Sequence, residues 1–110
     1  MRKIVRRDPK YVEALQVLSA NYMRRGDHVE GLKVDRKLVR LAPQDPTILY
    51  NLACSLCLNQ RRKQALVALN KAIDCGFDDY HLLMRDPDLD DLRRESHFDQ
   101  IRERILLMDH

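Results

Sequence analysis

The sequence predicts an all-α fold built from antiparallel helix pairs, and three observations support this prediction. The 110 residues include only three glycines, four prolines and 5% aromatic residues, a composition poor in the residues that β-sandwiches use for turns and strands. Good helix formers such as leucine, alanine, lysine, arginine and glutamine dominate the chain. Apolar residues also recur at helical spacing, and this pattern repeats with a period of 34 residues.

The 34-residue period is carried by apolar residues and by residues that mark helix ends. It pairs Pro9 with Pro43, Leu15 with Leu49, Leu18 with Leu52, Leu32 with Leu66, and Lys37 with Lys71. A unit of this length has room for two helices of about 11 or 12 residues each. Because one such unit cannot bury its apolar side alone, neighbouring units are expected to stack and share a core.

Short motifs mark where the helices begin and end. Asp8-Pro9 and Asp45-Pro46 each place an N-cap aspartate before a proline in the first helical turn. Gly76 is expected to end a helix in the left-handed conformation, with Phe77 folding back on the last turn.

The two units resemble the tetratricopeptide repeat (TPR). The first helix of that repeat carries a large residue, then a leucine, a small residue and an aromatic residue. The matching positions here are Leu15, Leu18, Ser19 and Tyr22 in the first unit, and Leu49, Leu52, Ala53 and Leu56 in the second. Gly31 and Ala65 match the later small residue of the family, and Pro43 matches its closing proline. The resemblance implies a right-handed α-α superhelix, a TPR-like solenoid of antiparallel helix pairs.

Three positions depart from the TPR pattern. Leu15 stands where the family has a tryptophan, Asp35 where an aromatic residue is usual, and Phe77 where the second closing proline would fall. These departures weaken individual contacts and leave the period intact.

The resemblance divides the chain, taken as a single TPR-like domain, into four parts. Residues 1–8 are expected to be the remnant of a preceding helix, residues 9–43 the first repeat and residues 44–78 the second. Residues 79–110 are expected to form a degenerate repeat that caps the stack, because a terminal repeat needs a polar outer face. Within this cap, Pro87 should cut the first helix short.

Stacked helix pairs leave a concave groove that is lined by the first helix of each unit. The side chains expected to line it as a binding site for a partner are Gln16, Val17, Ala20, Met23, Arg24, Thr47, Tyr50, Asn51, Cys54, His81 and Arg85. Tyr50, expected to be exposed, and Arg85 are the expected anchors of the interaction. The chain is therefore predicted to bind a peptide or a partner helix, as an adaptor or an assembly subunit.

The carboxylate clamp of some TPR proteins, which holds the C-terminal tail of chaperones, is not expected here. It needs a lysine and an asparagine on the first helix, an asparagine on the third, and a lysine and an arginine on the fifth. Asn51 and Arg85 match two of these positions, whereas Gln16, Ala20 and His81 replace the other three.

A zinc or redox module centred on Cys54 and Cys57 is one alternative. The C-x-x-C spacing suits such sites, but they place the pair at a turn or a helix start. Here the pair falls in the middle of a predicted helix, and nothing in the sequence fixes Cys75 or His81 beside it. We expect the cysteines to pack as small apolar residues and no metal to be bound.

A nucleic-acid binder with a basic edge is a second alternative. Basic clusters lie at residues 6–7, 24–25 and 61–63, and residues 1–71 hold 15 Lys/Arg against 6 Asp/Glu. Aromatic residues for base stacking are scarce, however, and residues 72–110 hold 5 Lys/Arg against 11 Asp/Glu. Binding to nucleic acid is therefore not expected, although the charge asymmetry would let copies of the chain pair head to tail.

Neither catalysis nor a membrane segment is predicted. The sequence lacks a nucleophile elbow and a glycine-rich phosphate loop, so it offers no catalytic residue or cofactor site. It contains no run of about 18 apolar residues and no secretory signal, and its three cysteines do not suggest a disulfide framework. A cytoplasmic protein without enzymatic activity is expected.

Overall fold

The computed structural model describes residues 8–108, and within them it contains helices and no strand. The helices are α2 (Pro9–Arg24), α3 (His28–Leu41), α4 (Pro46–Leu58), α5 (Arg62–Asp74), α6 (Tyr80–Leu83), the 3-10 helix η1 (Pro87–Leu89), α7 (Asp90–Arg93) and α8 (Phe98–Met108). The prediction of an all-α fold is confirmed. The predicted helix remnant at residues 1–8 lies outside the described residues, apart from Asp8.

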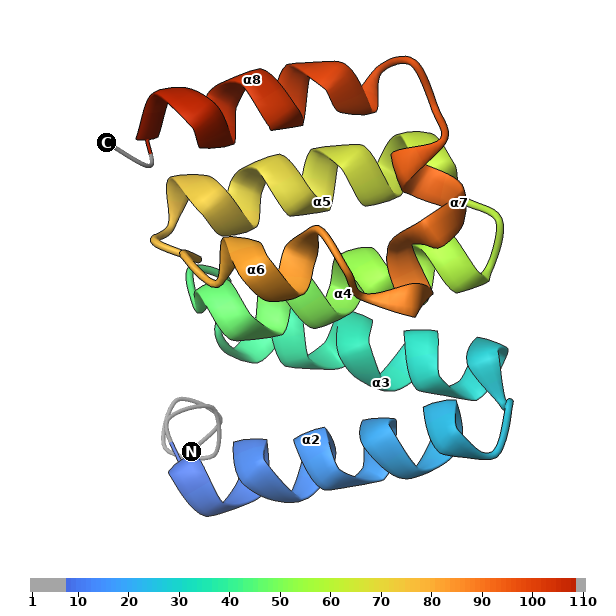
Figure 1. Ribbon diagram of the computed structural model, residues 1–110. Coiled ribbons are helices and arrows are strands. Elements are labelled where there is room, and N and C mark those ends of the chain that lie inside the picture. Colours follow the sequence, from blue (N-terminus) through green and yellow to red (C-terminus); the bar gives the residue numbers. More distant parts are fainter. Residues whose placement is uncertain (1–7, 109–110) are drawn as a thin grey trace.

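The four long helices of the N-terminal part follow one another in antiparallel order. Figure 1 shows α2, α3, α4 and α5 as successive layers, with α8 beyond α5 at the far end. Each helix packs on the next, α2 on α3, α3 on α4 and α4 on α5. The short segments η1 and α7 pack across α4 and α5. The described residues thus form an elongated stack of 43 × 30 × 20 Å.

Both Asp-Pro motifs start helices as predicted. The Asp8 carboxylate accepts a hydrogen bond from the backbone N–H of Lys10 at 2.9 Å. The Asp45 carboxylate accepts from the backbone N–H groups of Thr47 at 2.9 Å and Ile48 at 3.2 Å. In each case the side chain satisfies amides that have no partner inside the helix.

The turn after α5 needs a glycine. Gly76 has a φ of 109°, in the left-handed region that other residues rarely adopt. The backbone N–H of Phe77 then donates to the carbonyl of Ala72 at 2.9 Å, which folds the chain back over the last helical turn. This brings the Phe77 ring against Tyr50 of α4, with ring centroids 4.2 Å apart and planes 5° from parallel.

Helix α4 is the centre of the hydrophobic core. Its buried residues are Ile48, Leu49, Tyr50, Ala53, Cys54, Ser55, Leu56 and Cys57, which occupy most of its circumference and leave the side of Thr47 and Asn51 exposed. By contrast, α2 buries only Ser19, because α2 lies at the end of the described stack. Although α4 is apolar, it has 13 residues, and no described helix has both the length and the apolar character needed to cross a membrane.

The C-terminal segment forms part of the core. Pro87 cuts α6 to four residues, as predicted, and the chain turns back so that Leu89, Leu92 and Phe98 are fully buried. The Arg93 guanidinium fastens this turn by donating to the carbonyls of Leu83 at 2.8 Å and Asp86 at 2.7 Å.

Helix α8 is tied to α5 by a second arginine. The Arg104 guanidinium donates to the Asn70 carbonyl at 3.2 Å and to its side-chain oxygen at 3.1 Å, and it pairs with Asp74. On the same helix, Ile101 and Ile105 are buried in the common core.

Replacing Leu92 with alanine should destabilise the whole domain. Leu92 is fully buried, so Leu92→Ala should lower the free energy of unfolding by about 2 to 5 kcal/mol through lost burial and a residual cavity. Urea unfolding followed by circular dichroism measures the change. Leu107→Ala is the matched control, because Leu107 on α8 is 79% exposed and should change the value by less than about 0.5 kcal/mol. Equal effects of the two substitutions would show that the tail is not part of the core.

Candidate functional site

A hollow of about 390 Å³ opens between α2 and α4, and we name it the α2–α4 pocket. It is lined by Gln16, Ser19, Ala20, Met23, Arg24, His28, Asp35, Leu38, Asn51, Cys54, Ser55, Leu58, Asp86 and Asp88. Six of the residues that the sequence places in a binding groove are among them: Gln16, Ala20, Met23, Arg24, Asn51 and Cys54. The pocket is therefore the structure's strongest candidate for a binding site.

A buried carboxylate joins three helices at this pocket. Asp35 of α3 accepts a hydrogen bond from the Ser19 hydroxyl of α2 at 2.6 Å and another from the Ser55 hydroxyl of α4. Burial raises the pKa of Asp35, and the two serine hydroxyls oppose that rise. Thirty-four residues further on, Ala53 and Leu69 occupy the positions of Ser19 and Asp35, and both are fully buried. The first hairpin thus has a polar cluster where the second has apolar packing.

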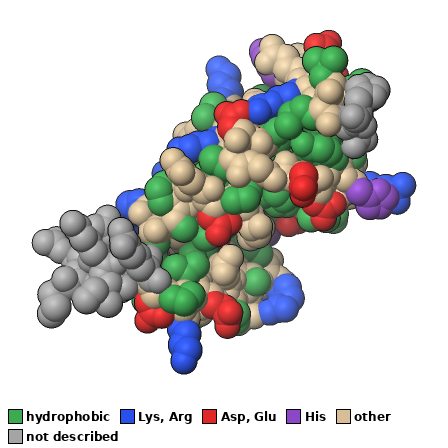
Figure 2. All heavy atoms as spheres, turned by 90° about the vertical axis from the view of Figure 1, so that its left-hand side faces the viewer, with side chains coloured by type: hydrophobic (Ala, Val, Ile, Leu, Met, Phe, Trp, Pro, Cys, Tyr) green, Lys and Arg blue, Asp and Glu red, His purple; other side chains and the backbone are tan. Residues whose placement is uncertain are grey.

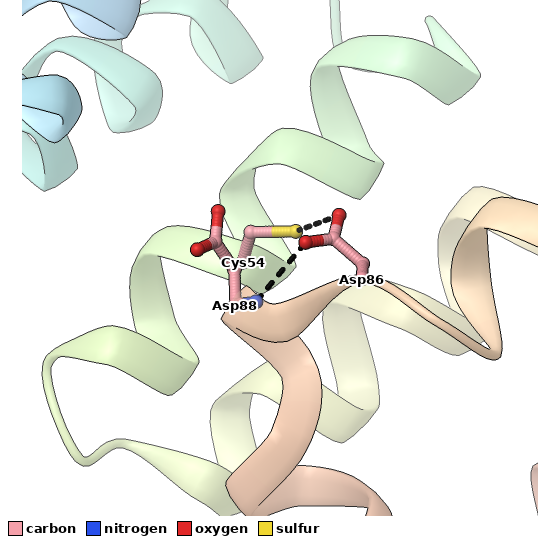
Figure 3. Close-up of side chains that lie close together, drawn as sticks. All are labelled: Cys54, Asp86 and Asp88. Atoms are coloured by element: carbon pink, nitrogen blue, oxygen red, sulfur yellow. Dashed lines mark hydrogen bonds between the residues drawn. The ribbon is translucent and has the colours of Figure 1, made fainter.

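The opposite wall of the pocket is built by the chain between α6 and η1. The Asp86 carboxylate accepts hydrogen bonds from the Tyr50 hydroxyl at 2.7 Å, from the Cys54 thiol at 3.7 Å and from the backbone N–H of Asp88 at 3.0 Å. Figure 3 shows the Cys54 sulfur pointing at Asp86, while the Asp88 carboxylate is turned away from it. Asp86 therefore caps η1 and ties the C-terminal segment to α4.

Among the described residues, the nearest approach to a metal site is the group Cys54, Asp86 and Asp88. One possible ligand atom from each lies within 4.8 Å of the others. Their positions have another explanation, because burial and the two carboxylates raise the pKa of Cys54 and its thiol donates to Asp86. In the described part of the chain, Cys57 and Cys75 are not part of such a group. The described residues thus give no support to the alternative of a zinc or redox centre on Cys54 and Cys57.

The expected exposure of Tyr50 is wrong. Its side chain is only 3% exposed, because its ring stacks on Phe77 and its hydroxyl is bound by Asp86. Burial raises the pKa of Tyr50 strongly, and the neighbouring Cys54 and Asp86 add to the effect. Tyr50 borders a second hollow together with Thr47, at the turn that contains Gly76. It is a core residue whose edge reaches this hollow.

Three predicted groove residues line neither hollow. Val17 on α2 is 56% exposed, and His81 and Arg85 are exposed on and just after α6. The chain turns after α6 instead of continuing the helix, so the row of groove residues stops at α4. The structure does not bring Arg85 to the α2–α4 pocket.

The basic clusters at residues 24–25 and 61–63 lie at turns on the same edge of the stack, on the right of Figure 1. Part of their charge is paired, since Arg25 lies 3.4 Å from Asp27 and Arg62 lies 3.2 Å from Glu95. The third cluster, at residues 6–7, is outside the described residues. These pairings reduce the positive charge that a phosphate backbone would meet.

The edge opposite the basic turns, on the left of Figure 1, includes the C-terminal end of α8 and exposes apolar side chains. Leu106, Leu107 and Met108 of α8 are exposed, and Leu82 of α6 is 41% exposed. Figure 2 shows hydrophobic side chains gathered over the upper part of this face, with acidic side chains among them.

Sequence reasoning missed the polar residues that give the pocket its chemistry. Asp35 was visible as a departure from the TPR pattern, but its hydroxyl partners were not. Asp86 and Asp88 were visible only as part of an acidic stretch around a helix-breaking proline. The signal that could have found the Asp35 cluster is a polar residue at a core position of α3 together with a serine on each of the neighbouring helices, α2 and α4.

Comparison with known proteins gives a limited match. The chain is 34% identical over 67 residues to a TPR repeat-containing protein of Picosynechococcus sp., covering 61% of this chain and 17% of that protein. It is 32% identical over 60 residues to a chloroplastic protein of Arabidopsis thaliana, covering 54% of this chain and 18% of that protein. The chain thus spans less than a fifth of the length of either relative. No family model matches it, and no solved structure matches it.

The Asp35 carboxyl should make stability fall as pH rises. Because its pKa is raised in the folded state, the folded protein keeps a proton that the unfolded chain loses above the ordinary value of 3.8. Asp35 should therefore lower the free energy of unfolding as pH rises above about 4, by at most about 1.4 kcal/mol per pH unit. The measurement is urea unfolding of wild type and Asp35→Asn from pH 4 to 7. As the pH rises, the free energy of unfolding of Asp35→Asn should increase relative to that of wild type. The exposed Asp78→Asn should show no such trend, and a constant difference for Asp35→Asn would contradict the assignment.

Removing the Tyr50 hydroxyl should loosen the C-terminal segment. Tyr50→Phe keeps the stacking on Phe77 but takes a donor from the partly buried Asp86, which should lower the free energy of unfolding by about 1 to 3 kcal/mol. Urea unfolding measures the loss. Tyr11→Phe on α2 is the control, because the Tyr11 ring is partly exposed under the Lys37 ammonium and should change stability by less than about 0.5 kcal/mol. Similar losses in both variants would rule out a specific role for the Tyr50–Asp86 bond.

Proposed function

We propose that this chain is a protein-interaction module that binds a peptide or a partner helix at the α2–α4 pocket, and that it acts by recognition and not by catalysis. The observation that carries the proposal is that six residues predicted for a binding groove line one pocket between the first helices of successive hairpins. The similarity to a protein named for its TPR repeats supports the same conclusion.

The proposal includes the arrangement of repeats. Residues 9–43 and 44–78 are proposed as two TPR-like units of a right-handed superhelix, and residues 79–110 as the segment that closes it. The helix hairpins α2–α3 and α4–α5, packed in series, support this division. In such a superhelix, α2 and α4 face the concave side, which is the side of the pocket.

The composition of the pocket suits recognition of a polypeptide. Gln16 and Asn51 offer amide groups that can pair with a peptide backbone, and Asn51 is exposed. Met23 adds a flexible apolar side chain that adapts to different partners. The volume of about 390 Å³ is near the lower end for ligand sites, so one or two side chains of a partner would fill it. An adaptor or assembly role follows from this mode of binding.

Filling the pocket should abolish peptide binding. A random-peptide library displayed on phage is panned against the wild-type domain, and the selected peptides are titrated by fluorescence anisotropy. Ala20→Trp places an indole in the pocket from an exposed position on α2 and should weaken binding at least tenfold, because it occupies the space of the ligand.

The matched control places the same indole elsewhere. Val67→Trp lies on α5 in a separate hollow beside the start of α8, at a position that is 70% exposed, and should leave binding unchanged. Circular dichroism of both variants should match wild type. Failure to select any peptide, or loss of binding only with Val67→Trp, would refute the proposed function.

A further inference from the structure

The α2–α4 pocket contains more acidic than basic groups at its inner surface. Three carboxylates line it, those of Asp35, Asp86 and Asp88, together with the side chains of Arg24 and His28. The ligand that the pocket can bind depends on which of these groups already form hydrogen bonds or ion pairs within the protein. A carboxylate that already accepts hydrogen bonds from the protein contributes less to the binding of a ligand.

Two of the three carboxylates are already satisfied by the protein. Asp35 accepts from two serine hydroxyls, and Asp86 accepts from Tyr50, Cys54 and the Asp88 amide. Asp88 is different. Within residues 8–108 its half-buried side chain makes neither a hydrogen bond nor an ion pair, and Figure 3 shows it turned away from Asp86.

The two basic side chains of the pocket, Arg24 and His28, form no ion pair with Asp88. Arg24 is exposed and donates to Asn21 on its own helix. His28 is near enough to lower the pKa of Asp88, but burial and the neighbouring Asp86 raise it, and no ion pair joins His28 to Asp88. The Nδ1 atom of His28 is itself buried without a hydrogen-bond partner among the described residues. In the part of the chain that the structure describes, therefore, no group forms a hydrogen bond or an ion pair with this half-buried carboxylate of Asp88.

The lining of the pocket suits a long cationic side chain. Met23, Leu38 and Leu58 give apolar contacts for a methylene stem, while Asp88 lies on the wall formed by the C-terminal segment. A chaperone tail, with its carboxylates, would meet the wrong charge here. Gln16 and Ala20 also stand where the carboxylate clamp needs a cation and an amide.

We propose that the α2–α4 pocket receives one lysine or arginine side chain of the bound peptide, with its cation against the Asp88 carboxylate. This inference rests on the proposed function and adds the chemistry of the residue that is recognised. A charge-assisted hydrogen bond in a partly buried site is strong enough to make that basic residue the main determinant of affinity.

The test uses the peptides selected by the wild-type domain, in buffer with EDTA so that no divalent cation occupies Asp86 and Asp88. The peptides should be enriched in lysine or arginine at one position, and replacing that residue with glutamine should weaken binding roughly tenfold or more. Asp88→Asn should weaken binding by a similar factor. The two changes together should weaken it little further, because each removes the same interaction.

Asp99→Asn is the control for net charge, since Asp99 lies at the start of α8 and pairs with Arg102. It should leave affinity unchanged. Two results would overturn this inference while the proposed function stands, both with peptides whose binding is weakened by Ala20→Trp. In the first, the selected peptides share no basic residue. In the second, Asp88→Asn and the glutamine change in the peptide weaken binding independently of each other. If no peptide binds the pocket at all, both fail.

Discussion

The structure depends on covering the apolar surface of α4. Buried residues occupy most of the circumference of this helix, which would be unstable in water without neighbours, and α3, α5 and the segment from α6 to α7 pack around it. The last of these is the least regular part of the chain, yet Leu83, Leu89 and Leu92 are fully buried in it. The same segment brings Asp86 to α4. It therefore both completes the hydrophobic core and forms one wall of the pocket.

The first hairpin differs from the second in the chemistry of its interior beside the pocket. Leu69 and Ala53 are buried apolar residues in the second hairpin, whereas Asp35 in the first accepts hydrogen bonds from Ser19 and Ser55. A buried carboxyl costs stability that an apolar residue would not. Its hydroxyl partners limit that cost and fix α2, α3 and α4 relative to one another around the hollow.

Local features could be predicted from the sequence, and contacts between distant segments could not. The helix starts at Asp8 and Asp45 and the turn at Gly76 depend on a few adjacent residues, so their motifs were sufficient. The burial of Tyr50 depends on Asp86, 36 residues away, which contacts α4 where the chain turns just before Pro87. The 34-residue period predicts that the row of groove residues continues to His81 and Arg85. This prediction fails because α6 ends at Leu83, where the repeat pattern is interrupted.

The covering of α4 also determines the reactivity of its two cysteines. Burial raises the pKa values of Cys54 and Cys57, so few thiolates form and oxidants find little to attack. Both thiols lie beneath the C-terminal segment, next to Asp86 and to the backbone of Leu92 respectively. Cys57 lines neither hollow, so thiol-modifying reagents would reach it only when that segment lifts, and it is therefore a chemical reporter of local opening.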